Sequence, residues 1–257
     1  MRLAGRRALV TGGGHGIGRA VALRLARSGA AVAVAARTRA DVDAVASELQ
    51  ELGVASVALV ADVARAEDVE GMFRAARAVL GGIDVLVTAA GVAPSAPLAR
   101  TSDEAWKAAI ETNLSGTFYC LREALPEMVE AGWGRVITLA SIAGKTGYPY
   151  VAAYAASKHG VLGLTKCAAV EVADKGVTVN AVCPGYVDTP MTDASIARIV
   201  EKTRRPPGEV RRRLEETSPQ KRLMTVQEVA GLVRYLCSEE ARGITGQALS
   251  VDGGTVV

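Results

Sequence analysis

A serine, a tyrosine and a lysine in the second half of the chain have the types and spacing needed for proton transfer at a carbonyl oxygen. Ser141 follows an apolar run, Tyr154 comes thirteen residues later and Lys158 four residues after that, in a segment that reads as a helix. Residues four apart share one face of a helix, so the phenol and the ammonium are expected to face the same space. The ammonium is then expected to lower the pKa of the phenol from about 10 toward the pH where acid–base catalysis is efficient.

Two further polar side chains could complete this site. Ser141 could hold the substrate oxygen by a hydrogen bond, and Asn113, in ETNLSG, could hold a water that connects Lys158 to solvent. Each of the four residues alone could be a structural polar group. Their combination behind a dinucleotide-binding loop points to catalysis.

A glycine-rich loop near the N-terminus predicts that dinucleotide site. The apolar run that ends at Thr11 is followed by GGGHGIG and then by a helical pattern. Glycines let the backbone turn tightly and approach a pyrophosphate, and the first N–H groups of the helix then point at it. The residues expected to contact the cofactor here are Gly12, Gly14, His15, Gly16, Ile17 and Gly18.

The end of the second apolar run predicts the choice of cofactor. An enzyme that uses NAD(H) usually has an acidic residue there, whereas this chain has Ala36 followed by Arg37. A guanidinium can pair with the 2′-phosphate of NADP(H), so NADP(H) is expected over NAD(H); the alternative is that Arg37 is an ordinary surface residue. His15 could be a second phosphate donor. Asp62, after the third run, could line the adenine site or cap a helix.

Short apolar runs alternate with longer helical patterns along the whole chain. This alternation predicts an α/β fold: a single-domain Rossmann-type doubly wound parallel sheet over residues 1–257, flanked by helices on both faces. The expected strands are Arg7–Thr11, Ala31–Ala36, Ser56–Val60, Val85–Thr88, Arg135–Ala140, Thr178–Cys183 and Ala248–Val251. The expected helices cover residues 17–28, 40–52, 66–80, 103–111, 114–131, 151–173 and 225–237.

The stretch from Thr189 to Thr225, called the lid segment below, is expected to be irregular, weakly packed and placed over the substrate. The net charge of the chain is +3, but residues 198–222 carry nine basic and four acidic side chains. This excess is either a solvated helix face or a patch for an anionic part of the substrate. No aromatic residue interleaves the charges, so nucleic-acid binding is not expected.

Composition argues against several other classes of protein. The four cysteines lie far apart and form no CxxC pair, so neither a metal site nor disulfides are expected. No apolar run reaches the roughly 18 residues of a membrane span, and the chain enters a strand without room for a signal peptide. A cytoplasmic location is therefore expected.

These motifs together resemble the short-chain dehydrogenase/reductase family over essentially the whole chain. The resemblance rests on TGGGHGIG, the Asn113 of ETNLSG, Ser141, YAASK and PGYVDTP at 184–190. It implies Tyr154 as acid/base, Lys158 as pKa modifier and ribose contact, Ser141 as substrate orienter and Asn113 as relay. It implies further cofactor contacts at Val63, Ala90, Gly91, Pro184, Gly185, Val187 and Thr189, beside Tyr154 and Lys158.

One motif departs from the family pattern. The fourth run reads VTAAG, where the family usually has Asn-Asn-Ala-Gly, so Ala89 lacks a side-chain amide that ties neighbouring strands. A cost in stability is expected, and no loss of activity.

Within the family the motifs look most like bacterial 3-oxoacyl-thioester and polyketide ketoreductases. The resemblance implies NADPH-dependent reduction of a 3-oxoacyl thioester, or a polyketide-like ketone, with acyl carrier protein as a possible partner and a homotetrameric assembly. The alternative enzyme is a dehydrogenase that oxidises a small or cyclic secondary alcohol, of the hydroxyacyl-CoA or hydroxy acid type. A cofactor-binding scaffold without turnover is disfavoured because all four catalytic candidates are present.

Overall fold

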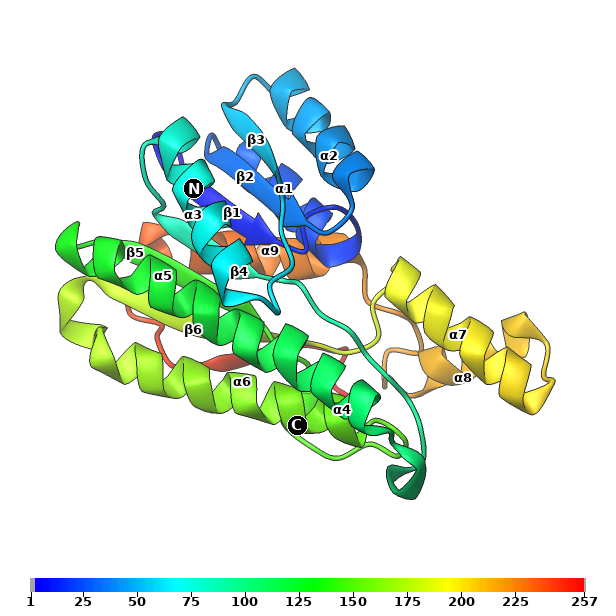
Figure 1. Cartoon of the computed structure of the whole chain (residues 1–257). Helices are drawn as coiled ribbons and strands as arrows, with labels where there is room; N and C mark the ends of the chain where they lie inside the picture. The colour runs from blue at the N-terminus through cyan, green and yellow to red at the C-terminus, as the bar shows by residue number, and fades with distance from the viewer. Residues whose placement is uncertain (1–2, 257) are drawn as a thin grey trace.

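Seven parallel strands form one sheet in the computed structural model, which describes residues 3–256 (Figure 1). The order across the sheet is β3-β2-β1-β4-β5-β6-β7, so the order reverses between β1 and β4. This is the predicted doubly wound arrangement, which opens a crevice at the carboxyl ends of the strands where the order reverses. The strands are β1 Arg7–Thr11, β2 Ala31–Ala36, β3 Ser56–Val60, β4 Val85–Thr88, β5 Gly134–Leu139, β6 Val177–Pro184 and β7 Ala248–Val251.

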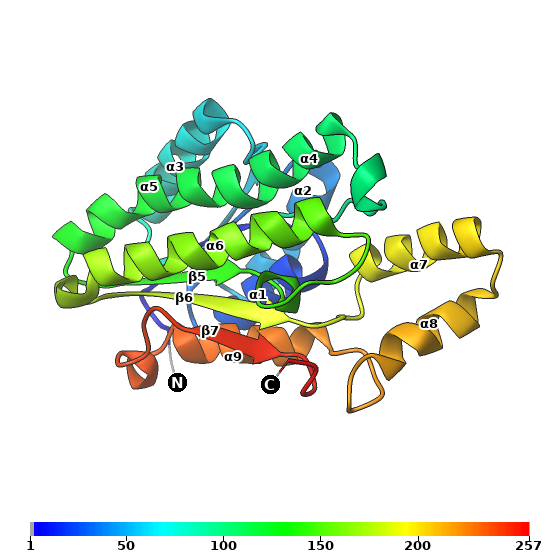
Figure 2. The ribbon, with the colours of Figure 1, turned by 90° about the horizontal axis from the view of Figure 1, so that it is seen from below.

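Helices cover both faces of the sheet, and Figure 2 shows α5 and α6 on one side with α9 on the other. Successive residues of a strand point to opposite faces, so runs of small aliphatic residues such as AVAVAA fill both layers. The helices are α1 Gly16–Ala26, α2 Arg39–Glu51, α3 Ala66–Leu80, α4 Asp103–Ala109, α5 Gly116–Glu130, α6 Ala152–Glu171, α7 Pro190–Thr203, α8 Pro207–Glu216 and α9 Val226–Leu236.

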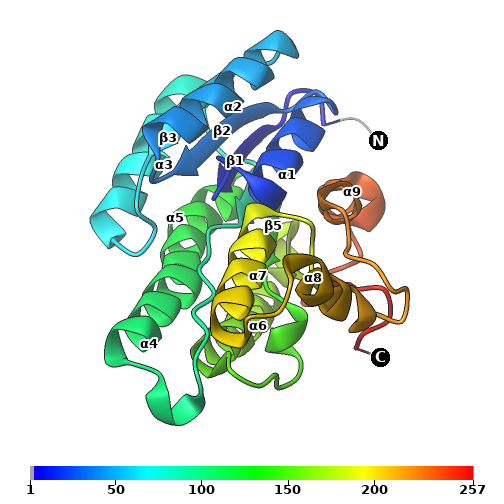
Figure 3. The same ribbon diagram turned by 90° about the vertical axis from the view of Figure 1, so that its right-hand side faces the viewer.

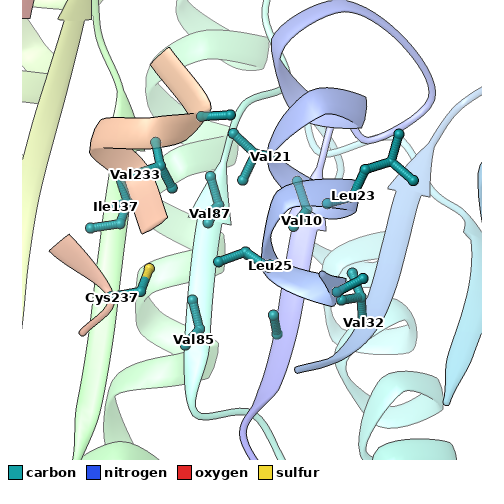
Figure 4. Packing of buried hydrophobic residues seen from close by; sticks show 14 of the residues in the cluster. Val10, Val21, Leu23, Leu25, Val32, Val85, Val87, Ile137, Val233 and Cys237 are labelled. Carbon is teal, nitrogen blue, oxygen red and sulfur yellow. The ribbon is translucent and has the colours of Figure 1, made fainter. Parts of the chain in front are cut away.

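Each face of the sheet has its own hydrophobic core. On one face Val10 and Val87 pack with Val21 of α1 and Val233 of α9, all fully buried (Figure 4). On the opposite face the side chains of β1 and β4 pack against α3 and α5, with Phe73 fully buried. No helix within residues 3–256 is both long and apolar enough to cross a membrane.

The junction between α4 and α5 differs from the two separate helices expected. A π-helical turn, Ile110–Ser115, joins α4 to α5 without a break. Such turns insert an extra residue into a helix and often mark functional positions, because they redirect a side chain. Asn113 lies in this turn.

The expectation of an irregular, weakly packed lid segment is wrong for residues 190–216. These form α7 and α8, which lie side by side (Figure 3) and project from the sheet (Figure 2). Ile196 of α7 packs with Val210 and Leu214 of α8 in a small buried cluster of their own. The apolar positions are split between two short helices, so no continuous stripe is visible in the sequence.

Candidate active site

A cleft opens where the carboxyl ends of β1, β2 and β4 meet the start of α7. Among its lining residues are the predicted cofactor contacts Gly12, His15, Gly16, Ile17, Gly18, Arg37, Asp62, Val63, Ala90, Gly91 and Thr189. Its lining does not include Gly14, Pro184, Gly185, Val187 or the catalytic candidates. The cofactor contacts expected at both sets of residues stay predictions.

The glycine loop packs closely against the backbone of the segment after β4. Gly12 has a φ of +63°, and a Cβ placed there would lie 2.6 Å from the backbone nitrogen of Ala90. His15 is the N-cap residue of α1, but its side chain caps none of the first N–H groups of the helix. Those N–H groups and the positive end of the helix dipole fit a pyrophosphate.

Gly14, like Gly12, allows close packing against a neighbouring element. A Cβ there would lie 2.8 Å from Cβ of Asp41, in the first turn of α2, so Gly14 lets this helix pack closely behind the loop. Asp41 itself lines the cleft, and the sequence reasoning did not single it out. An acidic residue in the first turn of a helix is common for reasons of the helix dipole, so the sequence held no separate signal.

The two arginines that follow β2 differ in their surroundings. Arg37 lines the cleft, is exposed and has no ion pair among residues 3–256, whereas Arg39 pairs with Asp43 at 3.7 Å. The guanidinium of Arg37 is therefore available to an anion. Asp62 does not cap α3, whose N-cap residue is Arg65; it lines the cleft and accepts a hydrogen bond from Ala64 N at 3.0 Å.

The predicted serine, tyrosine and lysine lie on adjoining elements beyond β5. Ser141 directly precedes a short 3₁₀ turn, Ile142–Gly144, and its Oγ accepts from Ala143 N at 3.1 Å. Tyr154 and Lys158 lie on α6, and Lys158 Nζ is 5.7 Å from the centre of the Tyr154 ring. Lys158 is buried and donates to the carbonyl of Leu139 at 2.6 Å.

The expected lowering of the tyrosine pKa is not what this structure shows. Burial raises the pKa of Tyr154, and the neighbouring Ser141 hydroxyl opposes part of that rise. Burial also lowers the pKa of Lys158, to about 8, and the ammonium donates its hydrogen bond to the carbonyl of Leu139. The raised pKa favours the protonated phenol, the form that can donate a proton.

Asn113 fastens three segments of the site together. Its Oδ1 accepts from Val92 N at 2.8 Å, and its Nδ2 donates to Val92 O and to Ser157 Oγ, both at 2.9 Å. Ser157 precedes Lys158 on α6, so the amide ties the π-helical turn to the segment after β4 and to the catalytic helix. The sequence reasoning missed Ser157, which resembles any small polar residue of a helix. The water relay through Asn113 stays a prediction.

Where the sequence departs from the family pattern, at the end of β4, side-chain hydrogen bonding is sparse. The hydroxyl of Thr88 is buried and has no hydrogen-bond partner within residues 3–256. The side-chain tie between β1 and the segment after β4 is a long hydrogen bond, 3.4 Å, from Ala90 N to Thr11 Oγ1.

Comparison with known proteins finds reductases that are similar along almost the whole chain. A family model described as enoyl-(acyl carrier protein) reductase matches residues 12–256. A 3-oxoacyl-[acyl-carrier-protein] reductase, FabG, of Staphylococcus aureus is 40% identical over 248 residues, which are 96% of each chain. The FabG of Staphylococcus epidermidis is equally similar, at 40% over 248 residues.

Solved structures share the whole fold. A variant of actinorhodin polyketide ketoreductase, solved with NADPH, has a TM-score of 0.94 and 38% identity, with 97% of each chain covered. Levodione reductase has a TM-score of 0.93 and 32% identity, with 98% of each chain covered.

Proposed function

The chain belongs to the short-chain dehydrogenase/reductase family of oxidoreductases, and from this premise we propose that it reduces 3-oxoacyl thioesters, or related polyketide-like ketones, with NADPH. The observation that carries the proposal is the arrangement of the buried Asn113 and Lys158 beside Tyr154 and Ser141, at the end of a cleft that fits a dinucleotide. The similarity to 3-oxoacyl reductases along 96% of the chain supports the choice of substrate.

Each of the four residues has a defined task in this proposal. Ser141 orients the substrate oxygen by a hydrogen bond, and Tyr154, held protonated by burial, donates a proton to that oxygen. Lys158 holds the end of β5 through Leu139 and contacts the ribose. Asn113 fixes the segment after β4 and relays protons toward solvent. The nicotinamide supplies the hydride when it is bound.

The cofactor in this proposal is NADP(H). The positive end of α1 and the glycine loop would hold the pyrophosphate, and Arg37 would pair with the 2′-phosphate. Asp41 is the group that could oppose this choice, because a carboxylate favours the ribose hydroxyls of NAD(H). The exposed, unpaired guanidinium of Arg37 is the reason to favour NADP(H).

The organisation of the molecule completes the proposal. The chain acts as one domain, with the lid segment 189–225 over the substrate, and assembles as a homotetramer, with acyl carrier protein as the partner that delivers the thioester. A basic surface suits such a partner, because carrier proteins and their phosphopantetheine arms are anionic.

The test is a rate measurement with both cofactors on a panel of ketones: acetoacetyl-CoA, a carrier-linked 3-oxoacyl thioester, a small ketoester and a cyclic diketone. We expect NADPH oxidation to be fastest with the thioesters. A protein that prefers NADH, or that only oxidises small secondary alcohols, would contradict the proposal and favour the dehydrogenase alternative. A protein without turnover in either direction would be a scaffold.

A further inference from the structure

Of the nine cations of residues 198–222, four pair with carboxylates, and five have no carboxylate within 4.0 Å among the described residues: Arg198, Lys202, Arg204, Arg212 and Lys221. Most of the arginines near α8 pair with carboxylates: Arg205 and Arg213 with Glu209, Arg211 with Asp188 and Glu215, and Arg222 with Glu228. Their charge is therefore largely compensated within the lid segment and its base. In particular, Arg211 joins α8 to the segment after β6, with 3.1 Å between Nη2 and the Asp188 carboxylate.

Two cations on α7 have no such partner. Neither Arg198 nor Lys202 has a carboxylate within 4.0 Å among the residues that the structure describes. Arg198 Nη2 donates to the carbonyl of Ala93 at 3.3 Å and to Ser195 Oγ at 3.0 Å, and Lys202 Nζ donates to the carbonyl of Ser95 at 3.5 Å. The two residues are four apart, so they lie on one face of α7, and their hydrogen bonds show that this face is turned to the segment after β4.

This segment leads directly to the candidate active site. Ala93 follows Val92, whose backbone is held on both sides by Asn113. Ala96 N donates to the carbonyl of Tyr150, four residues before Tyr154. At its other end α7 reaches the cofactor cleft, which Met191 lines. Arg198 and Lys202 therefore contact the segment that connects β4 to the candidate active site.

The partners of these cations are weak ones. A neutral carbonyl at 3.3–3.5 Å is a poor match for a full positive charge, and charge-assisted hydrogen bonds to an anion are shorter and about twice as strong. In addition, Arg198 Nε is buried and has no acceptor within residues 3–256. An anionic group that enters here would gain two cations and an unused donor, and would displace only neutral acceptors, the carbonyls of Ala93 and Ser95 and the hydroxyl of Ser195.

We infer that Arg198 and Lys202, and not the three consecutive arginines of α8, recognise an anionic group of the substrate, either a phosphate or a carboxylate. This inference rests on the proposed reduction of a ketone at Tyr154. It makes the two residues specificity determinants, while Arg211 and Arg213 hold the lid segment together. The phosphate of a pantetheine arm and the carboxylate of a free 3-oxo acid share the required chemistry.

The test compares KM values for four substrates in wild type and in Arg198→Met, Lys202→Met and the double variant. Acetoacetyl-CoA carries phosphates and acetoacetate carries a carboxylate, whereas the N-acetylcysteamine thioester and the ethyl ester of acetoacetate are uncharged. Arg212→Met is the matched control, because Arg212 is exposed on α8 and has no hydrogen bond or ion pair among the described residues. Arg198→Lys keeps the charge.

We expect the double variant to raise KM at least tenfold for one anionic substrate, the magnitude of losing a charge-assisted hydrogen bond, with the uncharged substrates changed less than twofold. The effect should shrink as salt rises, Arg198→Lys should restore part of it and Arg212→Met should show none. A higher KM for acetoacetyl-CoA would identify a phosphate as the recognised anion, and a higher KM for acetoacetate would identify a carboxylate. Equal increases in KM for all four substrates would mean that the cations only hold the lid segment to Ala93 and Ser95, and would overturn the inference. An unchanged KM for all four substrates would overturn it as well.

A second measurement separates this inference from the proposed function. A wild type that reduces none of the four substrates refutes the proposed function alone. Calorimetry with pantetheine 4′-phosphate, unphosphorylated pantetheine and acetoacetate then decides the inference without turnover. It stands if wild type binds one of the two anions at least tenfold more tightly than the double variant does, with pantetheine unchanged, and falls if the two proteins bind all three alike.

Discussion

The buried ammonium of Lys158 donates a hydrogen bond to the carbonyl oxygen of Leu139, with 2.6 Å between Nζ and the oxygen. The bond joins the catalytic helix α6 to the end of β5, next to Ser141. It also fixes the lysine where little solvent reaches it, and this burial lowers its pKa to about 8. A buried lysine that is held in this way has a cost in stability that depends on pH.

The first prediction concerns that cost. The folded-state pKa of about 8 lies below the ordinary 10.5, so the penalty for burying the charge is full below pH 8 and disappears as the pH approaches 10.5. At neutral pH it is about 3 kcal/mol. The free energy of unfolding of Lys158→Met, minus that of wild type, should therefore fall by a similar amount between pH 7 and pH 10.5. Urea unfolding without cofactor measures this difference in the free energy of unfolding. The control is Lys166→Met, because Lys166 is exposed on the same helix. A difference that is constant with pH would show that the folded lysine titrates normally.

The second prediction concerns Arg37. Arg37→Ala should weaken NADPH binding about 10–100-fold, because it removes a charge-assisted pair worth roughly 1.5–3 kcal/mol. NADH binding should hardly change. Arg39→Ala, two residues away and already paired with Asp43, should leave both affinities within about twofold. Dissociation constants for the two cofactors test this, and equal losses for NADPH and NADH in Arg37→Ala would refute the assignment.

The third prediction concerns two neighbouring threonines. Thr88 of β4 pairs in register with Thr138 of β5, but the buried hydroxyl of Thr88 has no partner, whereas that of Thr138 lies 2.8 Å from Thr165 Oγ1. Replacing an unsatisfied hydroxyl by a methyl group removes a desolvation cost, so Thr88→Val should raise the free energy of unfolding by about 1 kcal/mol. Thr138→Val should lower it by a similar amount. Denaturant unfolding of both variants is the measurement, and a loss of stability in Thr88→Val would mean that its hydroxyl is satisfied in solution.

The strands and most helices could be predicted from the sequence because parallel strands buried on both faces must be short aliphatic runs, and such runs stand out between helical patterns. The positions of Tyr154 and Lys158 on one helix followed from their spacing. The structure of the lid segment did not follow, because its apolar residues are divided between α7 and α8 and only their mutual packing shows the pattern. The partners of the basic residues could not be predicted either, since Arg211 and Asp188 meet only in the folded chain.

The pKa of Tyr154 was predicted in the wrong direction for a related reason. Spacing places an ammonium near a phenol, but the balance between attraction and burial depends on everything packed around both groups. Here burial dominates at both residues. Ser157 and Asp41 were missed because small polar and acidic residues are common on helices, and only the structure shows that one contacts Asn113 and the other lines the cleft.

The most direct test of the account is the turnover of Tyr154→Phe with NADPH and a 3-oxoacyl thioester. The substitution removes only the phenolic oxygen, so the ring still packs on α6 and NADPH affinity should be nearly intact. If the phenol donates the proton to the substrate oxygen, kcat should fall by about 10²–10⁴-fold, the usual contribution of a general acid. A variant that keeps more than about a tenth of wild-type turnover would remove Tyr154 from the mechanism.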